Sequence, residues 1–254
     1  MTATLTTHHL PFTTITLCLD FGNTRLKLAL FEDDELKEIL VLQNDASRHL
    51  EEIIKKYSPH RSILSSVIEH DIKIEELLTA TTQFHKLSHT SKLPFTIPVG
   101  KPETMGADRI AIAAAAVFLF PAQNNLAIGL GTCITYNFIN QLNEFIGGSI
   151  SPGMEMRFLS MHQFTAKLPL VKAHWNVPLI GYDTATNMQS GVVLGIAKEI
   201  DGIIDSYKEK FGNFNALLTG SDGHLFKPYL KNKIFADPDL IFKGLYAISQ
   251  FNIA

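Results

Sequence analysis

Two copies of one pattern, a strand, a glycine turn and a second strand, constrain the fold of this chain more than any other feature. The first copy joins apolar runs at residues 15–20 and 25–32, and the second joins runs at 126–131 and 134–139. In each copy a third strand follows, and helices then alternate with strands. Such a duplication predicts two similar α/β domains facing each other across a cleft, with one glycine turn from each domain at the cleft.

The apolar periodicity gives the expected elements of both halves. In the first half we expect strands at 15–20, 25–32, 36–42, 63–67 and 84–87 and helices at 46–57, 72–80 and 106–120. In the second half we expect strands at 126–131, 134–139, 142–146 and 215–219, helices at 154–166 and 184–210, and further helices toward the end. The two domains then span residues 15–118 and 119–254, after a short, flexible polar extension at 1–14.

The composition argues against several classes of protein. The 254 residues are 46% hydrophobic, with a formal net charge of −3 and no basic cluster, which argues against a nucleic-acid surface. The longest apolar stretch, at 110–120, is shorter than the about 20 residues that cross a bilayer, so no membrane span is expected. Cys18 and Cys133 lie in strand-like runs without a CxxC partner, which predicts reduced thiols in a cytoplasmic protein.

The turn of the first copy has the chemistry that nucleotide phosphates require. Gly22 lets the backbone approach an anion, and exposed N–H groups of such a turn can donate to it. Asn23 and Thr24 add neutral donors, Lys27 adds a positive charge, and Asp20 is a candidate ligand for Mg²⁺. A plain hairpin explains the same residues, because Gly-Asn-Thr is ordinary turn chemistry, so this turn alone leaves both interpretations open.

A second candidate site opens the apolar helix at 106–120. Asp108 and Arg109 stand side by side there, and an acid in a first helical turn has a structural explanation in the helix dipole. In the functional interpretation the carboxylate accepts the proton of a substrate hydroxyl, and the guanidinium binds a carboxylate or phosphate in fork geometry. Because the helix is apolar nearly all round, it is expected to be buried, which places the pair at the floor of the cleft.

Three further glycine-containing segments complete the pattern. Residues 147–153 are predicted as a glycine-dense turn, and residues 181–184 cap the long helix through Asp183 or Thr184. Residues 219–223 follow a short apolar strand, a place that commonly lies against adenosine in nucleotide-binding folds.

Taken in order, these motifs resemble those of type III pantothenate kinases. Between Leu17 and Leu245 the chain has Asp-x-Gly-Asn-Thr-x-x-Lys, Gly-Ala-Asp-Arg, Gly-Thr, Gly-Gly-x-Ile-x-Pro-Gly, Gly-x-x-Thr and Thr-Gly. That family belongs to the actin, sugar-kinase and acetate-kinase superfamily, so the resemblance implies two ribonuclease H-like domains around a nucleotide cleft. It also implies a homodimer that phosphorylates pantothenate with ATP to 4′-phosphopantothenate, the first step of coenzyme A biosynthesis.

The resemblance assigns roles to individual residues. Asp108 would take the proton from the primary hydroxyl of pantothenate, and Thr132 would contact a phosphate from the second hairpin. The first ATP phosphate site would consist of Asp20, Phe21, Gly22, Asn23, Thr24, Arg25, Leu26 and Lys27. The pantothenate site would consist of Val99, Gly106, Ala107, Asp108 and Arg109, with Thr184 contributed by a neighbouring protomer. The family also uses Mg²⁺, here at Asp20, and a monovalent cation such as K⁺ or NH₄⁺.

Three positions depart from the family pattern. Gly129 replaces the aspartate that resembles the potassium ligand, so a site at this position would rely on carbonyl dipoles and water. We therefore expect weak or absent activation by potassium, and a gain of potassium dependence in Gly129→Asp. Val99 stands where the family often has tyrosine, and Gly220-Ser221 replaces a double glycine.

Two other functions remain open at this point. A member of the same fold that binds a nucleotide or partner but turns over poorly would act as an accessory or regulatory factor, and Gly129 motivates this alternative. A kinase of the same superfamily could also act on another hydroxyl substrate. The active pantothenate kinase is favoured, because a decayed site rarely keeps its base, anion clamp and phosphate turn together. The residues that support this are Asp20, Lys27, Asp108, Arg109 and Thr184.

Overall fold

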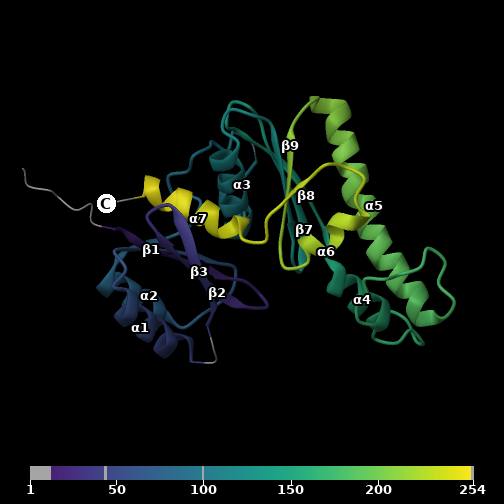
Figure 1. Cartoon of the computed structure of the whole chain (residues 1–254), viewed down its shortest axis with the longest axis horizontal. Coiled ribbons are helices and arrows are strands. Elements are labelled where there is room, and N and C mark those ends of the chain that lie inside the picture. Colours follow the sequence, from purple (N-terminus) through teal and green to yellow (C-terminus); the bar gives the residue numbers. More distant parts are fainter. Residues whose placement is uncertain (1–12, 43–44, 99, 253–254) are drawn as a thin grey trace, which may run out of the picture.

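The computed structural model describes residues 13–42, 45–98 and 100–252, and it contains two five-stranded sheets with helices packed on them (Figure 1). In the first half the elements are β1 (Ile15–Phe21), β2 (Leu26–Glu32), β3 (Glu35–Val41), α1 (Ala46–Tyr57), β4 (Arg61–Ser66), α2 (Ile72–Thr81), β5 (Gln83–Lys86), a 3₁₀ turn (Pro102–Thr104) and α3 (Ala107–Leu119). In the second half they are β6 (Asn125–Leu130), β7 (Cys133–Ile139), β8 (Phe145–Pro152), α4 (Met154–Gln163), α5 (Thr184–Phe211), β9 (Asn215–Thr219), α6 (Gly223–Phe226), a 3₁₀ turn (Lys227–Tyr229), β10 (Phe235–Ala236) and α7 (Leu240–Phe251).

The two sheets have the same topology. The first has the strand order β3-β2-β1-β4-β5, and the second has the order β10-β9-β6-β7-β8. In each sheet the first three strands along the chain pair antiparallel with one another. The two later strands of the chain are then added in parallel, beginning next to the first strand. The predicted fold class, an α/β protein made of a duplicated three-strand-plus-helices unit, is therefore confirmed.

Side chains of β1 point alternately to the two faces of the first sheet, and helices cover both faces. Leu17 and Leu19 point to the face covered by α1 and α2, where they pack with Leu50 and Leu78. Cys18 lies on the opposite face, in the cluster that includes α3 and α7. Asp20 continues this second series at the end of the strand, so its carboxylate lies on the same face as α3 and α7.

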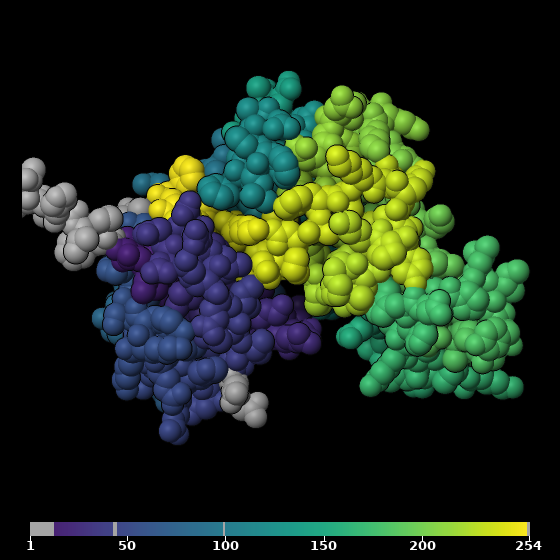
Figure 2. All heavy atoms as spheres, viewed as in Figure 1, coloured from purple at the N-terminus to yellow at the C-terminus, as the bar shows by residue number. Residues whose placement is uncertain are grey.

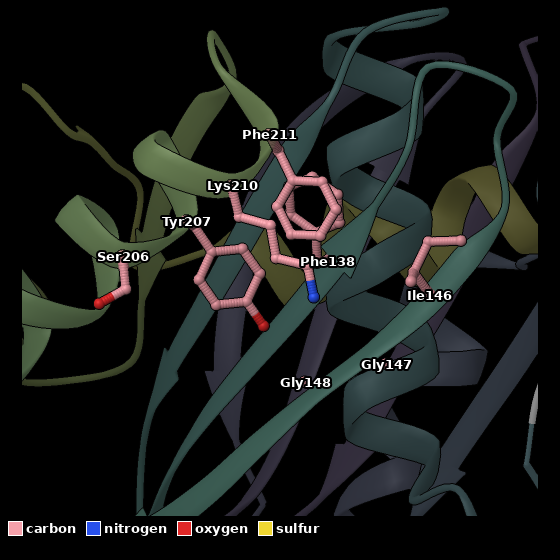
Figure 3. A pocket seen from close by; sticks show the side chains of 8 residues that line it. All are labelled: Phe138, Ile146, Gly147, Gly148, Ser206, Tyr207, Lys210 and Phe211. Atoms are coloured by element: carbon pink, nitrogen blue, oxygen red, sulfur yellow. The ribbon is translucent and has the colours of Figure 1, made fainter.

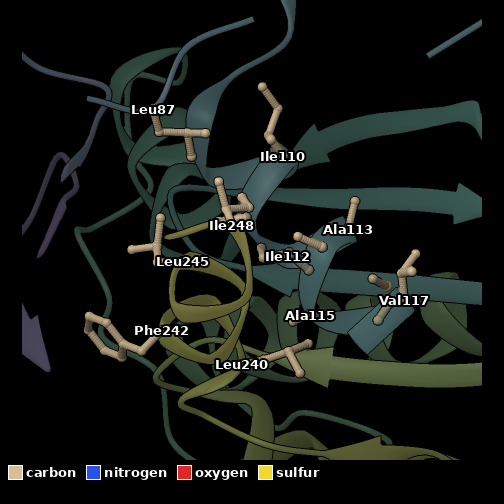
Figure 4. Packing of buried hydrophobic residues seen from close by; sticks show 14 of the residues in the cluster. Leu87, Ile110, Ile112, Ala113, Ala115, Val117, Leu240, Phe242, Leu245 and Ile248 are labelled. Carbon is tan, nitrogen blue, oxygen red and sulfur yellow. The ribbon is translucent and has the colours of Figure 1, made fainter. Parts of the chain in front are cut away.

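The second sheet is covered in the same way. Tyr136 and Phe138 of β7 pack with apolar residues of α5, while Ile139 joins the cluster of α3 and α7. Helices α3 and α7 therefore share one core between the two sheets (Figure 4). Their contact is very close, because a Cβ added to Gly244 of α7 would lie 1.8 Å from the backbone oxygen of Ala111. This contact fixes the position of α3 relative to α7.

The structure corrects one predicted strand and adds another. The third strand of the second sheet is β8, at Phe145–Pro152, and not residues 142–146 followed by a turn. The sequence of the glycine-dense segment 147–153 predicts a turn, but most of this segment pairs with β7. Gly147 has a φ of 127° and lies next to a shift in the register between β7 and β8. Strand β10 has only two residues and no detectable periodicity.

The domain boundary at 118/119 stays a prediction. Helix α3 ends at Leu119, near that boundary, and α7 returns to pack against β1 and β4 of the first sheet. Of the predicted N-terminal extension, residues 1–12 lie outside the described residues, and Thr14 donates its backbone N–H to Asp33. None of the helices that the structure describes is both long and apolar enough to cross a bilayer.

Candidate active site

The turn between β1 and β2 reaches toward the second half of the molecule. Figure 2 shows a hollow between its purple atoms and the green segment around α4. Gly22 closes the turn by donating its N–H to the Arg25 oxygen at 3.2 Å. The side chains of Asn23 and Thr24 are exposed, and their N–H groups donate to no acceptor within the described ranges. The turn therefore presents free donors to the hollow, as a phosphate site requires.

Asp20 and Asp108 come together although 88 positions separate them. The pKa of Asp20 is raised to about 6, mainly by burial and also by the charge of Asp108, while Lys27 lowers it. Lys27 faces Asp20 directly across the β1–β2 ladder. Two carboxylates and one ammonium group thus meet where β1 ends and α3 begins.

Gly106 explains the orientation of Asp108. A Cβ at Gly106 would lie 2.5 Å from Oδ1 of Asp108, so the carboxylate occupies space that only glycine leaves free. Asp108 stands in the first turn of α3, where the helix dipole favours its charge, yet its side chain does not cap the helix. Its carboxylate is left for an external partner.

Arg109 is held on two sides. Its Nε donates to Oδ1 of Asn137 at 2.8 Å, and its guanidinium carbon lies 5.7 Å from the centre of the Phe145 ring. Burial lowers the pKa of Arg109 from its usual high value, while Asp108 and Tyr207 favour the charged form. Guanidinium stays protonated in proteins, so this is a fixed cation beside Asp108.

The second hairpin turn rests on the end of β8. Thr132 is exposed, and its backbone oxygen accepts a hydrogen bond from the Gly153 N–H at 3.0 Å. A Cβ at Gly153 would lie 2.2 Å from the Gly131 oxygen, so the glycine after Pro152 is needed for this contact. The arrangement places Thr132 at the rim of the second sheet.

A third turn, at 219–223, packs beside the second hairpin. Gly220 has a φ of 109°, and a Cβ there would lie 1.9 Å from the Leu130 oxygen. Burial and Glu155 raise the pKa of Asp222, whereas His224 and Arg25 lower it. Because Arg25 belongs to the first hairpin, the turns of the two halves face each other across the hollow.

One predicted residue, Thr184, is not brought to the cleft. Val99 lies outside the described residues. Thr184 is exposed at the start of α5, where Asp183 forms a capping box with Thr186. In Figure 1 that end of α5 lies beyond α4, on the side of the second sheet away from the first half. Thr184 therefore has no contact with Asp108 among the described residues.

Other groups near the cleft were not predicted from the sequence. Burial and Asp237 raise the pKa of Asp239, while Lys243 and Lys27 lower it, so the segment before α7 lies near the first hairpin. The sequence signal for this segment is a pair of acids, Asp237 and Asp239, directly before the apolar helix α7. Asn137 was also missed, and its only signal was an amide inside the apolar run of β7.

Two cavities lie apart from the hairpin turns. One, of about 310 Å³, is lined by Phe138, Ile146, Gly147, Gly148, Ser206, Tyr207, Lys210 and Phe211, between β7–β8 and α5 (Figure 3). The other, of about 540 Å³, lies along α5 and includes Val177, Leu179 and Tyr229. No predicted site residue lines either cavity, so the cleft between the hairpins remains the candidate active site.

Solved structures with a similar fold are distant in sequence. A conserved protein from Campylobacter jejuni, assigned to the Baf family of transcriptional activators, is 22% identical, with a TM-score of 0.57 over 93% of this chain and 98% of that one. A glucokinase from Balamuthia mandrillaris, solved with glucose, is 9% identical, with a TM-score of 0.50 over 94% of each chain. These similarities concern the fold alone.

Relatives by sequence are much closer. A type III pantothenate kinase of Christiangramia forsetii is 42% identical over 238 residues, which cover 93% of this chain and 98% of that protein. The corresponding protein of Flavobacterium johnsoniae is 39% identical over 240 residues, with the same coverage. The family model described as type III pantothenate kinase matches residues 16–206. On this extent of similarity, the chain belongs to the type III pantothenate kinase family.

Proposed function

We propose that this protein carries out the reaction for which its family is named. It transfers the γ-phosphoryl group of ATP to the primary hydroxyl of pantothenate and forms 4′-phosphopantothenate and ADP, the first step of coenzyme A biosynthesis. The observation that carries the proposal is the meeting of Asp20, Lys27 and Asp108 beside the donor-rich hairpin turn. Since the groups for phosphate binding and proton transfer are together, we favour the enzyme over a catalytically weak accessory relative.

The first hairpin turn binds the phosphates of ATP. Its free N–H groups donate to the phosphate oxygens, the Lys27 ammonium balances their charge, and Thr132 contacts a phosphate from the other side of the cleft. Asp20 fits a divalent cation, because it is a partly buried carboxylate beside a second one and lacks a hydrogen-bond partner among the described side chains. When bound, Mg²⁺ offsets the negative charge of the phosphates.

Asp108 and Arg109 act on pantothenate. Arg109 binds the carboxylate of the substrate through its terminal nitrogens and thereby directs the hydroxyl toward Asp108. The hydroxyl oxygen forms a bond to the γ-phosphorus, the bond from that phosphorus to the bridging oxygen breaks, and ADP leaves with the electron pair. The carboxylate of Asp108 accepts the hydroxyl proton during the transfer. The kinetics of an Asp108→Asn variant test the role of Asp108.

The proposed assembly is a homodimer with a composite active site. Leu179, Ile180 and Tyr182 are each more than 80% exposed, and they directly precede Thr184. Exposed apolar side chains that follow one another in this way are typical of a protein–protein contact surface. In the proposal a second copy covers this surface, and its Thr184 contacts the pantothenate bound at the first copy's Asp108.

Subunit mixing tests the composite site. Neither Asp108→Asn nor Thr184→Ala chains alone should be active, but a heterodimer of the two contains one intact site. Random exchange makes half of the dimers mixed, so activity should return to about a quarter of the wild-type value. The control mixes two preparations that both carry Asp108→Asn. If verified exchange restores no activity, Thr184 acts within its own chain or only at the helix start.

The monovalent cation site is expected to be weak in this protein. A Cβ at Gly129 would lie 2.9 Å from the Thr135 Oγ1 and 3.0 Å from the Ile112 Cδ1, so neighbouring side chains fill the space of the family's carboxylate. An aspartate there would have to displace both neighbours, which makes Gly129→Asp a structural change as well as a change in charge.

A potassium titration of the wild-type protein is therefore the cleaner test. When KCl replaces tetramethylammonium chloride at constant ionic strength, we expect kcat to change by less than about twofold, since no formal charge holds the ion. The same titration with NH₄⁺ is the companion measurement. Saturable activation at low millimolar concentration would show that a cation site survives without the carboxylate at residue 129.

A further inference from the structure

Asn137 is a wholly buried amide in the middle of β7, on the face of the second sheet that α3 covers. Its Nδ2 donates to the Ala127 oxygen at 3.1 Å and to Thr135 Oγ1 at 3.3 Å. These bonds fix the orientation of the amide, because a carbonyl oxygen can only accept. The Asn137 Oδ1 must then point the other way, toward Arg109.

Arg109 uses only one of its nitrogens in this contact. Nε donates to the Asn137 Oδ1 at 2.8 Å, and no hydrogen bond from either terminal nitrogen to the described part of the chain is present. The ring of Phe145 lies against the guanidinium from another side. An amide oxygen orients the cation without cancelling its charge, so both terminal nitrogens and the full positive charge remain for a substrate anion.

We propose that Asn137 is a positioning residue, which directs the fork of Arg109 toward the carboxylate of pantothenate. This inference rests on the proposed role of Arg109 in substrate binding. The bond reaches from the second sheet to the helix that carries Asp108, so it also ties the direction of the anion clamp to the position of the base. Its loss should weaken pantothenate binding and leave ATP binding nearly unchanged.

A double-mutant cycle measures this coupling. We expect Asn137→Ala to raise the Kd of pantothenate in calorimetry, and its KM, about tenfold, as for a lost hydrogen bond to a charged group. The KM of ATP should stay within about twofold of the wild-type value. In an Arg109→Ala background the same Asn137→Ala change should have no further effect on pantothenate, because the group that it orients is gone.

Two variants separate positioning from structural support. Asn137→Asp keeps an oxygen that faces Nε but adds a buried negative charge, so pantothenate affinity should stay low because the charge of Arg109 is then offset. Asn125→Ala removes another wholly buried asparagine, whose amide donates to Phe120 and Gln123, and should cost stability without changing the pantothenate KM. If Asn137→Ala does not fold, Asn137→Ser withdraws the same acceptor with a smaller loss of polar contacts.

Different outcomes would contradict the positioning role of Asn137 and the substrate-binding role of Arg109. An equal rise in the KM values of ATP and pantothenate, or an undiminished effect of Asn137→Ala in the Arg109→Ala background, would overturn the positioning role. An Arg109→Ala variant that binds pantothenate as the wild type does would overturn the proposed role of Arg109, and the inference about Asn137 with it.

Discussion

Asp108→Asn is expected to lower kcat for pantothenate phosphorylation by a factor of about 10²–10⁴, the usual contribution of a general base. The amide has the shape of the carboxylate, so the close contact with Gly106 and the start of α3 should persist. ATP binding measured by calorimetry should therefore remain close to that of the wild-type protein. The loss would appear in kcat and kcat/KM alike, because proton transfer occurs only in the transition state.

A second carboxylate near the cleft provides the matched control for this variant. Asp239 stands before α7, within the electrostatic reach of Lys27, and has no proposed role in proton transfer. Asp239→Asn should change kcat far less than Asp108→Asn does. Turnover of Asp108→Asn near the wild-type rate would remove Asp108 from its role as the base.

Asp20→Asn is expected to lower kcat/KM for Mg²⁺-ATP by about a hundredfold and to change the pH dependence of the enzyme, since a cation ligand is lost. In the free wild-type protein the pKa of Asp20 is raised to about 6, mainly by burial. The wild-type activity should fall as the pH drops through this value, because the protonated carboxyl group no longer binds a cation. Lys27→Ala should move this acid limb upward, since Lys27 lowers the pKa of Asp20.

The same pKa shift makes Asp20 costly for folding. Because its pKa is higher in the folded protein than the usual value of 3.8, the folded state binds more protons between these two values. The contribution of this group to stability is thus fully present below pH 3.8, falls as the pH rises to about 6, and stays low above that.

Thermal unfolding checks the sign of this effect. Asp20→Asn should raise Tm relative to the wild-type protein at pH 8, where the buried charge is present, and the difference should shrink toward pH 4. Mg²⁺-ATP should stabilise the wild-type protein more than the variant. A variant that is less stable than the wild type at pH 8, with unchanged use of Mg²⁺-ATP, would contradict both assignments.

Local sequence signals predicted most of the elements. Helix α1 and strand β9 begin and end where the pattern placed them, because caps and turn residues bound an apolar stripe on both sides. The signal failed at β8, where Gly147 and Gly148 indicate a turn by local preference. There, pairing with β7 decides the structure, and tertiary contacts of this kind are not encoded within one segment.

The site was predicted less completely than the fold. The resemblance of ordered motifs named Asp20 and Asp108, but only the packing of α3 between the two sheets explains why they meet. The bond from Arg109 to Asn137 joins residues 28 positions apart on a helix and a strand, and no spacing rule predicts it. Thr184, in contrast, was predicted from the motifs but does not reach the site within one chain. Its predicted role requires a second copy of the chain.

Pantothenate-dependent formation of ADP by the purified protein tests the central claim most directly. With Mg²⁺-ATP and pantothenate, we predict ADP and 4′-phosphopantothenate in equal amounts, with the phosphate located on the primary hydroxyl by ³¹P NMR and mass spectrometry. Without pantothenate, ADP formation should fall to background. If pantothenate does not stimulate ADP formation, or if another hydroxyl compound is phosphorylated in preference to it, the assignment of Asp108 and Arg109 to pantothenate is wrong.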